Sequence, residues 1–378
     1  MSDQHDVGTV VADTSAVSLP QSGADAALTQ SPGLRRPFNP AGAQACLTGL
    51  LLLIICGSCL GVDYFARSPL VAKWLMSSEL REWKHKNLQH QHRMYFADFE
   101  DRLLLDELPQ ADFSKGGVYF IGASNVKVSI MPWLLSDNLR QRVGNYGFSA
   151  STPAQQFQFL RYLVEHKGLA VAGDKTLVVL GLFYGTAYTA EDRPNATFFE
   201  KLFGRHGLFT YTQADGIAPV PMSGLERTLR IEKVRCAGFL DALCHLGTKS
   251  SYKPTKHDPE AYRKYRIDFL GENWREGMSS QVAELGKMIA YLRARGVRVM
   301  VIYMPQATWH DSLPHPAEFR KQTESLCQAC DIPIVDFSKL LADGDFYDST
   351  HANYVGQHKL HQAMMEIVDR HLRQCEVK

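Results

Sequence analysis

Short apolar runs alternate with helical patterns through most of the chain. The apolar runs, each rich in β-forming residues, occupy 117–122, 142–146, 175–183, 297–304 and 332–337. Apolar residues recur at helical spacing from Pro153 onward and in 279–295, 316–329 and 353–372. Continuously apolar strands separated by helices are typical of a parallel sheet covered on both faces. The pattern therefore predicts an α/β fold: a three-layer α/β/α sandwich with a mostly parallel, flavodoxin-like sheet that binds ligands at the carboxyl ends of its strands.

Residues 186–275 interrupt this alternation. The segment is rich in polar and aromatic residues, contains several Gly and Pro, and has no clear period. We interpret it as an insertion, within a catalytic domain that spans 116–378, beside the ligand-binding edge of the sheet. Its basic residues are roughly balanced by acids, which favours a solvated surface over binding of an anionic polymer; they are Arg193, Arg205, Arg227, Arg230, Lys233 and Arg235.

One apolar segment lies far upstream of the sheet pattern. Residues 45–62 are almost entirely apolar, and no charged residue occurs between 37 and 62. At about 1.5 Å per residue such a helix covers most of a bilayer core about 30 Å thick. We therefore predict a transmembrane helix over 45–65, preceded by a disordered tail (1–44) and followed by a linker and helical stem (66–115). A cleaved signal peptide is the alternative, but the run begins late in the chain for such a signal.

The net charge and the distribution of basic residues do not indicate a function. The formal net charge is +1, and no Lys/Arg-rich run occurs, so we expect no nucleic-acid partner. Two arginines precede the apolar segment and more basic residues follow it, so the positive-inside rule does not favour an outward-facing catalytic domain. The following basic residues are Arg67, Lys73, Arg81, Lys84 and Lys86.

The cysteines do not form a recognisable metal site. Those in the apolar segment are Cys46, Cys56 and Cys59, which we interpret as small apolar fillers. Downstream lie Cys236, Cys244 and the pair Cys327 and Cys330. Neither a second Cys-x-x-Cys pair nor suitably spaced histidines complete a metal site, so we expect no metal and no cofactor. Structural thiols and a disulfide both remain open.

A serine follows the first predicted strand. In Gly122-Ala123-Ser124-Asn125 the hydroxyl would lie on a small-residue turn at the ligand-binding edge of the sheet, and the next helix would offer backbone N–H groups to an oxyanion. A serine at this position caps a helix more often than it acts as a nucleophile, so the motif alone is weak.

A second polar motif follows the last predicted strand. In Asp348-Ser349-Thr350-His351 the histidine could take the proton of a serine hydroxyl, and the aspartate could fix its tautomer within the same loop. Asp345 is the alternative carboxylate at a less favourable spacing. Because the carboxyl ends of parallel strands share one edge, we predict that Ser124, Asp348 and His351 form a catalytic triad. Other histidines, such as His310, His315 and His358, have no partner at ligand spacing and are expected to be packing or surface residues.

These motifs resemble the SGNH (GDSL-like) hydrolase superfamily from Gly116 to about Leu372, apart from the insertion. In that family a serine after the first strand is the nucleophile, and a DxxH motif near the carboxyl end supplies the acid and the base. The resemblance implies these roles for Ser124, Asp348 and His351. It also implies that the oxyanion is bound by the amides of Ser124 and of Gly147, the glycine after the second strand.

The sequence departs from the family in two places. The nucleophile turn reads Gly-Ala-Ser-Asn rather than Gly-Asp-Ser. The third block, which normally carries an oxyanion-binding Asn, is Gly181-Leu182-Phe183-Tyr184-Gly185 and contains no Asn. Either Tyr184 or a main-chain amide would have to substitute. Since loss of one oxyanion donor costs about 10²–10³ in rate, a slow or specialised enzyme is expected.

An apolar segment before such a domain resembles the membrane-anchored DltD-like proteins and the SGNH proteins of polysaccharide O-acetylation. The resemblance implies a serine esterase or O-acyltransferase that modifies a cell-envelope polysaccharide or polymer through an acyl-enzyme. It also implies a membrane-bound O-acyltransferase partner and a single-pass inner-membrane protein with its catalytic domain in the periplasm. The alternatives are a non-catalytic scaffold of such a complex and a membrane-proximal hydrolase of small esters or lipids.

Overall fold

The computed structural model describes residues 40–67, 99–131, 134–188, 198–212, 216–244, 258–346, 348 and 350–376. The chain divides into two units, 1–53 and 54–378, which are described separately. Helix α1 (Pro40–Arg67) covers the predicted span 45–65 and begins before it, so residues 40–44 are helical rather than part of a disordered tail. Among the described helices, none is long and apolar enough to cross a membrane. The predicted transmembrane helix is thus not confirmed, and the predictions for 1–39 and 68–98 lie outside the described residues.

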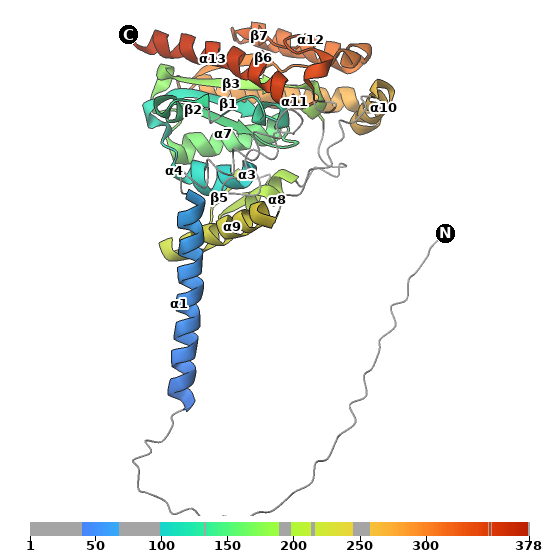
Figure 1. The fold of residues 1–378 in the computed structure, drawn as a ribbon. Helices are drawn as coiled ribbons and strands as arrows, with labels where there is room; N and C mark the ends of the chain where they lie inside the picture. Colours follow the sequence, from blue (N-terminus) through green and yellow to red (C-terminus); the bar gives the residue numbers. More distant parts are fainter. Residues whose placement is uncertain are drawn as a thin grey trace, which may run out of the picture. The chain divides into compact units, whose positions relative to one another are not determined.

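Five parallel strands form the central sheet, in the order β2-β1-β3-β6-β7 (Figure 1). They are β1 (Gly117–Gly122), β2 (Val143–Gly147), β3 (Thr176–Leu182), β6 (Arg298–Tyr303) and β7 (Ile334–Asp336). This is the flavodoxin-like order, and the parallel α/β prediction is confirmed. The chain turns from one direction to the other between β1 and β3, so a ligand is expected beyond their carboxyl ends. There Gly122 pairs with Gly147 on one side and Gly181 on the other.

Helices cover both faces of the sheet. On one face lie α7 (Pro153–Lys167), α11 (Trp274–Arg293) and α12 (Pro314–Ala329). On the other face, α5 (Ser124–Lys127) and α13 (Tyr354–Glu376) pack against a second apolar cluster. Strand β3 shows the alternation: Val178 and Leu180 belong to the first cluster, and Leu177 and Val179 to the second. Because both faces are covered, the strand is apolar throughout.

The region predicted as an insertion has its own elements. They are α8 (Phe198–Gly204), the antiparallel pair β4 (Phe209–Thr212) and β5 (Gly216–Pro219), α9 (Gly224–Cys244) and α10 (Pro259–Leu270). Phe199 lies 5.5 Å from Phe148 between ring centroids, and Phe203 lies 6.1 Å from Phe159. The aromatic residues of the insertion therefore extend the main core.

The end of the predicted stem also packs into this domain. It comprises α3 (Phe99–Arg102), a π-helical turn η3 (Leu103–Glu107) and α4 (Leu108–Gln110). Leu103, Leu104 and Leu105 are buried in the same core as α7. The described part of the domain thus begins earlier than the predicted boundary at residue 116. The remaining short elements are α6 (Asp137–Arg140), η4 (Phe113–Lys115), η6 (Gly173–Lys175), η7 (Tyr184–Thr186), η8 (Thr308–Ser312) and η9 (Asp343–Asp345).

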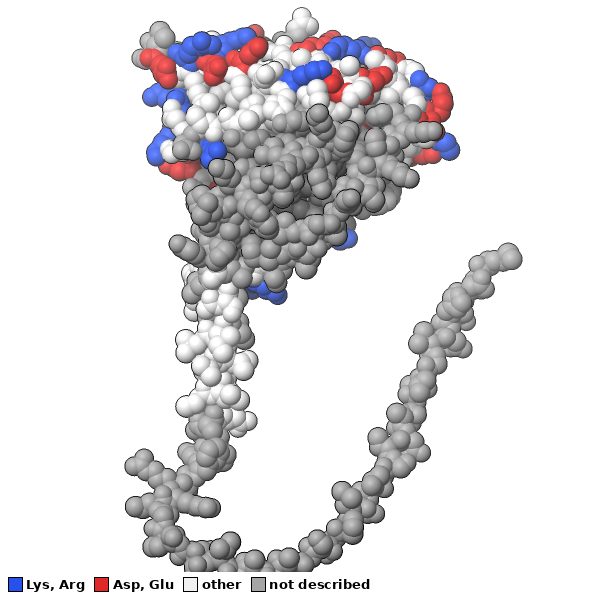
Figure 2. All heavy atoms as spheres, viewed as in Figure 1, with Lys and Arg blue, Asp and Glu red and all other residues white. Residues whose placement is uncertain are grey.

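The described surface carries charges of both signs. Figure 2 shows acidic and basic side chains intermingled over the part of the molecule that contains α12 and α13. Such mixing is typical of a solvated face rather than of a surface that tracks one kind of polyion.

Candidate active site

Three glycines at the carboxyl ends of neighbouring strands bring the serine helix down onto the sheet. A Cβ at Gly122 of β1 would lie 2.3 Å from Val126 Cγ2, and one at Gly181 of β3 would lie 2.2 Å from the same atom. A Cβ at Gly147 of β2 would lie 2.1 Å from the backbone nitrogen of Lys127. At each of these positions a side chain would overlap α5. Glycine therefore allows α5 to sit directly over the strand ends. Its first residue, Ser124, is thereby fixed at the ligand-binding edge.

The structure brings the three predicted triad residues together. The Ser124 Oγ atom lies 2.7 Å from His351 Nε2, and His351 Nδ1 lies 2.7 Å from Asp348 Oδ2. An ionised carboxylate only accepts hydrogen bonds, so Nδ1 is the protonated nitrogen and Nε2 is left to accept the serine proton. The three side chains are partly exposed, so a substrate can reach them. These contacts span residues that lie 227 positions apart in the sequence.

The loop that carries Asp348 and His351 is fixed by its own backbone. Asp348 Oδ1 accepts hydrogen bonds from the amides of Thr350 and His351, both at 2.8 Å, while Oδ2 faces the imidazole. An aspartate readily forms such a turn with amides two and three residues ahead. A bridge between Phe346 and Ala352 closes the base of the loop. One carboxylate therefore shapes the loop and orients the histidine.

These contacts also set the charge of Asp348. Burial alone would raise its pKa, but the hydrogen bond from the His351 ring and those from the two loop amides outweigh burial and hold the pKa of Asp348 below its usual value. The carboxylate is therefore ionised at neutral pH. Asp345, the alternative carboxylate, instead accepts from Lys359 Nζ at 2.7 Å and from the Ala342 amide at 3.0 Å.

The two predicted oxyanion amides differ in their surroundings. Ser124 is the first residue of α5, so its amide has no acceptor within the helix. The Gly147 amide donates to Asn145 Oδ1 at 3.2 Å, so it is engaged inside the protein. Packing against Lys127 explains the glycine at position 147 without an oxyanion role. The role of the Ser124 amide stays a prediction.

The turn after β2 contains a feature that the sequence analysis missed. Ala150 has a φ of 55°, a left-handed conformation that is uncommon for a residue with a side chain. The same turn is tied to the end of β1, because the Phe148 amide and the Ser151 hydroxyl both donate to the carbonyl of Gly122. Strained backbone of this kind clusters at functional sites. No sequence signal reveals it, since alanine is not a residue typical of this conformation.

A buried ion pair supports both the serine helix and this turn. Lys127 Nζ contacts the two carboxylate oxygens of Glu100 at 2.8 and 2.7 Å and Ser149 Oγ at 3.0 Å. Glu100 also accepts hydrogen bonds from the amide and the hydroxyl of Ser149. The next residue, Asp101, accepts from His206 of the insertion at 2.6 Å. Helix α3 thus links the serine helix, the β2 turn and the insertion.

Tyr184 does not have the surroundings predicted for an oxyanion donor. Its side chain is fully buried and its hydroxyl is hydrogen-bonded to His310 Nδ1. Burial raises the pKa of Tyr184 well above its usual value, so the phenol stays protonated. His310 and His315 are themselves buried. The Tyr184 hydroxyl is therefore hydrogen-bonded within the core, because a buried phenol needs a hydrogen-bond partner.

The cysteine pair carries free thiols rather than a disulfide. Cys327 is buried and Cys330 is partly exposed. Burial raises the pKa of Cys327 to about 11, so this thiol is protonated and unreactive at neutral pH. Of the two interpretations left open by the sequence, structural thiols are the one observed.

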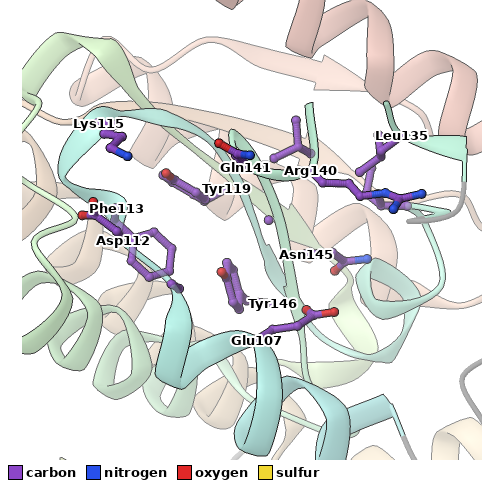
Figure 3. A pocket seen from close by; sticks show the side chains of 14 residues that line it. Glu107, Asp112, Phe113, Lys115, Tyr119, Leu135, Arg140, Gln141, Asn145 and Tyr146 are labelled. Atoms are coloured by element: carbon purple, nitrogen blue, oxygen red, sulfur yellow. The ribbon is translucent and has the colours of Figure 1, made fainter. Parts of the chain in front are cut away.

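A cavity of about 520 Å³ lies beside the edge strand β2 (Figure 3). The triad residues do not line it. Its walls combine phenol rings with side chains of both charges, including Tyr119, Tyr146, Glu107 and Arg140. The rings of Tyr119 and Tyr146 lie 6.4 Å apart and both contact Phe113, so this wall is an extension of the core.

The chain is similar to two solved structures, both distantly. One is a protein of Bacteroides fragilis assigned provisionally as an acylhydrolase, with a TM-score of 0.36 and 15% identity, covering 73% of this chain and 99% of that chain. The other is a GDSL-like lipase of Bacteroides thetaiotaomicron, with a TM-score of 0.35 and 12% identity, covering 72% and 98%. No family model and no curated protein matches the chain. At this distance, the contacts within the site carry the functional argument.

Proposed function

We propose that the protein is a serine esterase or O-acyltransferase in which Ser124 is the nucleophile. The observation that supports this most directly is the continuous path from the Ser124 hydroxyl through the His351 ring to the ionised Asp348 carboxylate, with 2.7 Å at each step. A serine hydroxyl is a poor nucleophile until a positioned base takes its proton, and this arrangement supplies that base.

The reaction proceeds in two halves. His351 Nε2 takes the Ser124 proton as Oγ bonds to the carbonyl carbon of an ester. The ester C–O bond then breaks, and His351 returns the proton to the departing alcohol. In the second half, His351 deprotonates water or an acceptor hydroxyl, which attacks the acyl carbon; the bond between that carbon and Ser124 Oγ breaks, and His351 returns the proton to Oγ. Asp348 stabilises the imidazolium that forms in each half, and the Ser124 amide stabilises the developing oxyanion.

Probe labelling tests this assignment. A fluorophosphonate reacts with activated serines, so the full chain should acquire one adduct, and mass spectrometry should place it on Ser124. The Ser124→Ala variant should acquire none. Ser129 offers a matched control, because its hydroxyl donates a hydrogen bond to the Val126 carbonyl. The Ser129→Ala variant should therefore still acquire the adduct. An adduct that persists in Ser124→Ala, or an unlabelled wild type beside a labelled reference esterase, would refute the proposal.

The acceptor is a cell-envelope polysaccharide or polymer in this proposal, and a membrane-bound O-acyltransferase supplies the acyl group. The layout of an apolar segment ahead of the triad domain supports it by analogy. Acyl transfer to polysaccharide in a reconstituted membrane, lost in Ser124→Ala, is the expected result. Hydrolysis of short p-nitrophenyl esters without polymer acylation would favour a small-ester or lipid hydrolase instead.

We also propose that α1 holds the protein in the inner membrane, with the catalytic domain on the periplasmic side. The large apolar side chains at 50–54 are each more than half exposed, and such a surface is stable only in an apolar environment. The described side chains of α1 are uncharged in Figure 2, in agreement with the sequence.

An alkaline wash of isolated membranes checks the anchor. The wild-type chain should stay in the pellet, and the Leu51→Arg/Leu53→Arg variant should be released, since each charge costs about 2.5–3.5 kcal/mol in the middle of a span. Leu225 and Leu229 of α9 are equally exposed leucines, so Leu225→Arg/Leu229→Arg is the matched control and should stay bound. Release of the wild type would contradict the anchor.

A further inference from the structure

Arg266 of α10 is a nearly buried cation surrounded by aromatic rings. Its side chain is 6% exposed. The guanidinium carbon lies 5.3 Å from the ring centroid of Phe183, 5.9 Å from that of Tyr184 and 5.7 Å from that of Phe269. Within the described part of the chain its contacts are with these rings and not with a carboxylate, and its Nε is buried without a hydrogen-bond partner.

Ring faces do not satisfy a guanidinium. A cation over a ring gains some energy from the π system, but the N–H donors lie in the plane of the guanidinium and still need acceptors. A buried charge without a partner is destabilising. Arginine nevertheless occupies this position, so an acceptor that the described residues do not supply would account for it.

A second buried polar group beside the same tyrosine also has no partner. His315 is 2% exposed and its Nδ1 has no hydrogen-bond partner among the described residues. Its ring stacks on Tyr184 at 6.1 Å with an interplanar angle of 10°. Burial, then the charges of Arg266 and Arg275, lower the pKa of His315 to about 4, so the ring is neutral and able to donate one hydrogen bond.

The backbone leaves room for the guanidinium at the catalytic edge of the sheet. A Cβ at Gly185 would lie 2.6 Å from one terminal nitrogen of Arg266, so glycine there admits the side chain. Gly185 follows β3 and Ser124 follows β1, and these strands are neighbours whose ends pair at Gly181 and Gly122. One terminal nitrogen of Arg266 therefore lies beside the segment that follows β3, the strand next to the one that precedes Ser124.

We infer that Arg266, with His315 beside it, forms a subsite for an oxyanion, a carboxylate or phosphoryl group, on the molecule that reacts at Ser124. The fork of guanidinium donors matches the geometry of both anions, and burial strengthens such a contact. The inference rests on the proposed function and adds the substrate class: an anionic acceptor or acyl donor.

Anion binding by the full chain tests the subsite. Inorganic phosphate and acetate are titrated at constant ionic strength, and the melting temperature is followed, since a ligand that binds only the folded state raises it. We expect at least one of the two anions to stabilise the wild type, and the stronger one identifies the phosphoryl or the carboxylate class. In Arg266→Gln the apparent Kd for that anion should rise roughly 10-fold or more, as expected when a charge-assisted hydrogen bond is lost.

Three further variants sharpen the comparison. Arg295 also lies over a tyrosine ring, at 3.6 Å, but beyond α11 at the opposite edge of the sheet, so Arg295→Gln should bind the anion as the wild type does. If Arg266→Gln fails to fold, Arg266→Lys keeps the charge without the planar fork, and Gly185→Ala displaces the fork; both should weaken binding. The inference would be overturned if the anions raised the melting temperature of the wild type and of all Arg266 and Gly185 variants equally. It would also be overturned if the anions raised the melting temperature of none of these proteins.

A kinetic readout connects the subsite to Ser124. The bound anion should slow fluorophosphonate labelling of Ser124 in the wild type and have roughly 10-fold less effect at the same concentration in Arg266→Gln. Anion binding that depends on Arg266 in a protein that is never labelled would leave the subsite standing and remove the proposed hydrolase chemistry. If Ser124 is labelled but anions neither slow the labelling nor bind in a way that depends on Arg266, the hydrolase chemistry stands and the subsite is removed.

Discussion

Replacing His351 with alanine should reduce ester hydrolysis and probe labelling by roughly 10⁴–10⁶-fold, because Ser124 then has no base to accept its proton. The expected loss exceeds that of any other single side chain except Ser124 itself. The measurement is the second-order rate of fluorophosphonate labelling, together with kcat/KM for a p-nitrophenyl ester. The fold should persist, since the His351 side chain is partly exposed and its loss leaves no core cavity.

The companion substitution Asp348→Asn should cost about 10⁴ in the same rate, because an amide no longer fixes the tautomer or stabilises the imidazolium. His358, in the following helix, is the matched control, and His358→Ala should be labelled at close to the wild-type rate. Near-normal labelling of His351→Ala would show that His351 is not the base that activates Ser124, whereas a wild type that is never labelled would favour the scaffold alternative.

The lowered pKa of Asp348 adds a pH dependence to this series. A carboxylate whose pKa is lower in the folded than in the unfolded chain stabilises the fold above its usual pKa of about 3.9, and this stability disappears as the pH falls through the lowered value. Asp348→Asn should therefore lose less stability than the wild type between about pH 5 and pH 2. Denaturant titrations across that range measure the difference.

The sequence predicted the strands and the edge at which the chemistry converges. Strand pattern and position were enough, because short apolar runs rich in β-forming residues, such as 175–183, are typical of central strands and because parallel strands end on one side. Ser124 and His351 could thus be paired although they lie far apart in the chain. The aspartate was identified for a local reason: its spacing allows one loop to hold both the carboxylate and the ring.

What the sequence did not predict depends on side-chain packing between distant segments. Gly147 follows the second strand as expected, yet its close approach to Lys127 depends on where α5 rests. Tyr184 lies at the predicted edge of the sheet, but its hydroxyl is hydrogen-bonded to His310, which belongs to another loop. Arg266 was not singled out from the sequence at all, because nothing in its local pattern marks it. Only the folded chain reveals that its neighbours are rings.

The buried pair of Glu100 and Lys127 leads to the second large prediction. Glu100 is 1% exposed, and its carboxylate holds both the serine helix and the turn after β2. Glu100→Ala should lower the free energy of unfolding by about 3–5 kcal/mol, because the buried Lys127 ammonium then loses this carboxylate. Glu100→Gln should cost less, since an amide still accepts from Ser149. Denaturant unfolding of the full chain measures both.

The cost should depend on the unpaired charge rather than on lost packing. The double variant Glu100→Gln/Lys127→Met removes both charges of this pair, so it should be more stable than Lys127→Met alone, which keeps the buried carboxylate and takes away the Lys127 ammonium. Glu226 pairs with Arg230 at a similar 2.7 Å but on an exposed helix face, so Glu226→Ala should cost less than about 1 kcal/mol. If Glu100→Ala and Glu226→Ala lowered the free energy of unfolding equally, burial would not make the Glu100–Lys127 pair more important for stability than an exposed pair. Because Lys127 and Ser149 belong to the two segments that frame Ser124, the Glu100 variants that still fold should also be labelled more slowly than the Glu226 control.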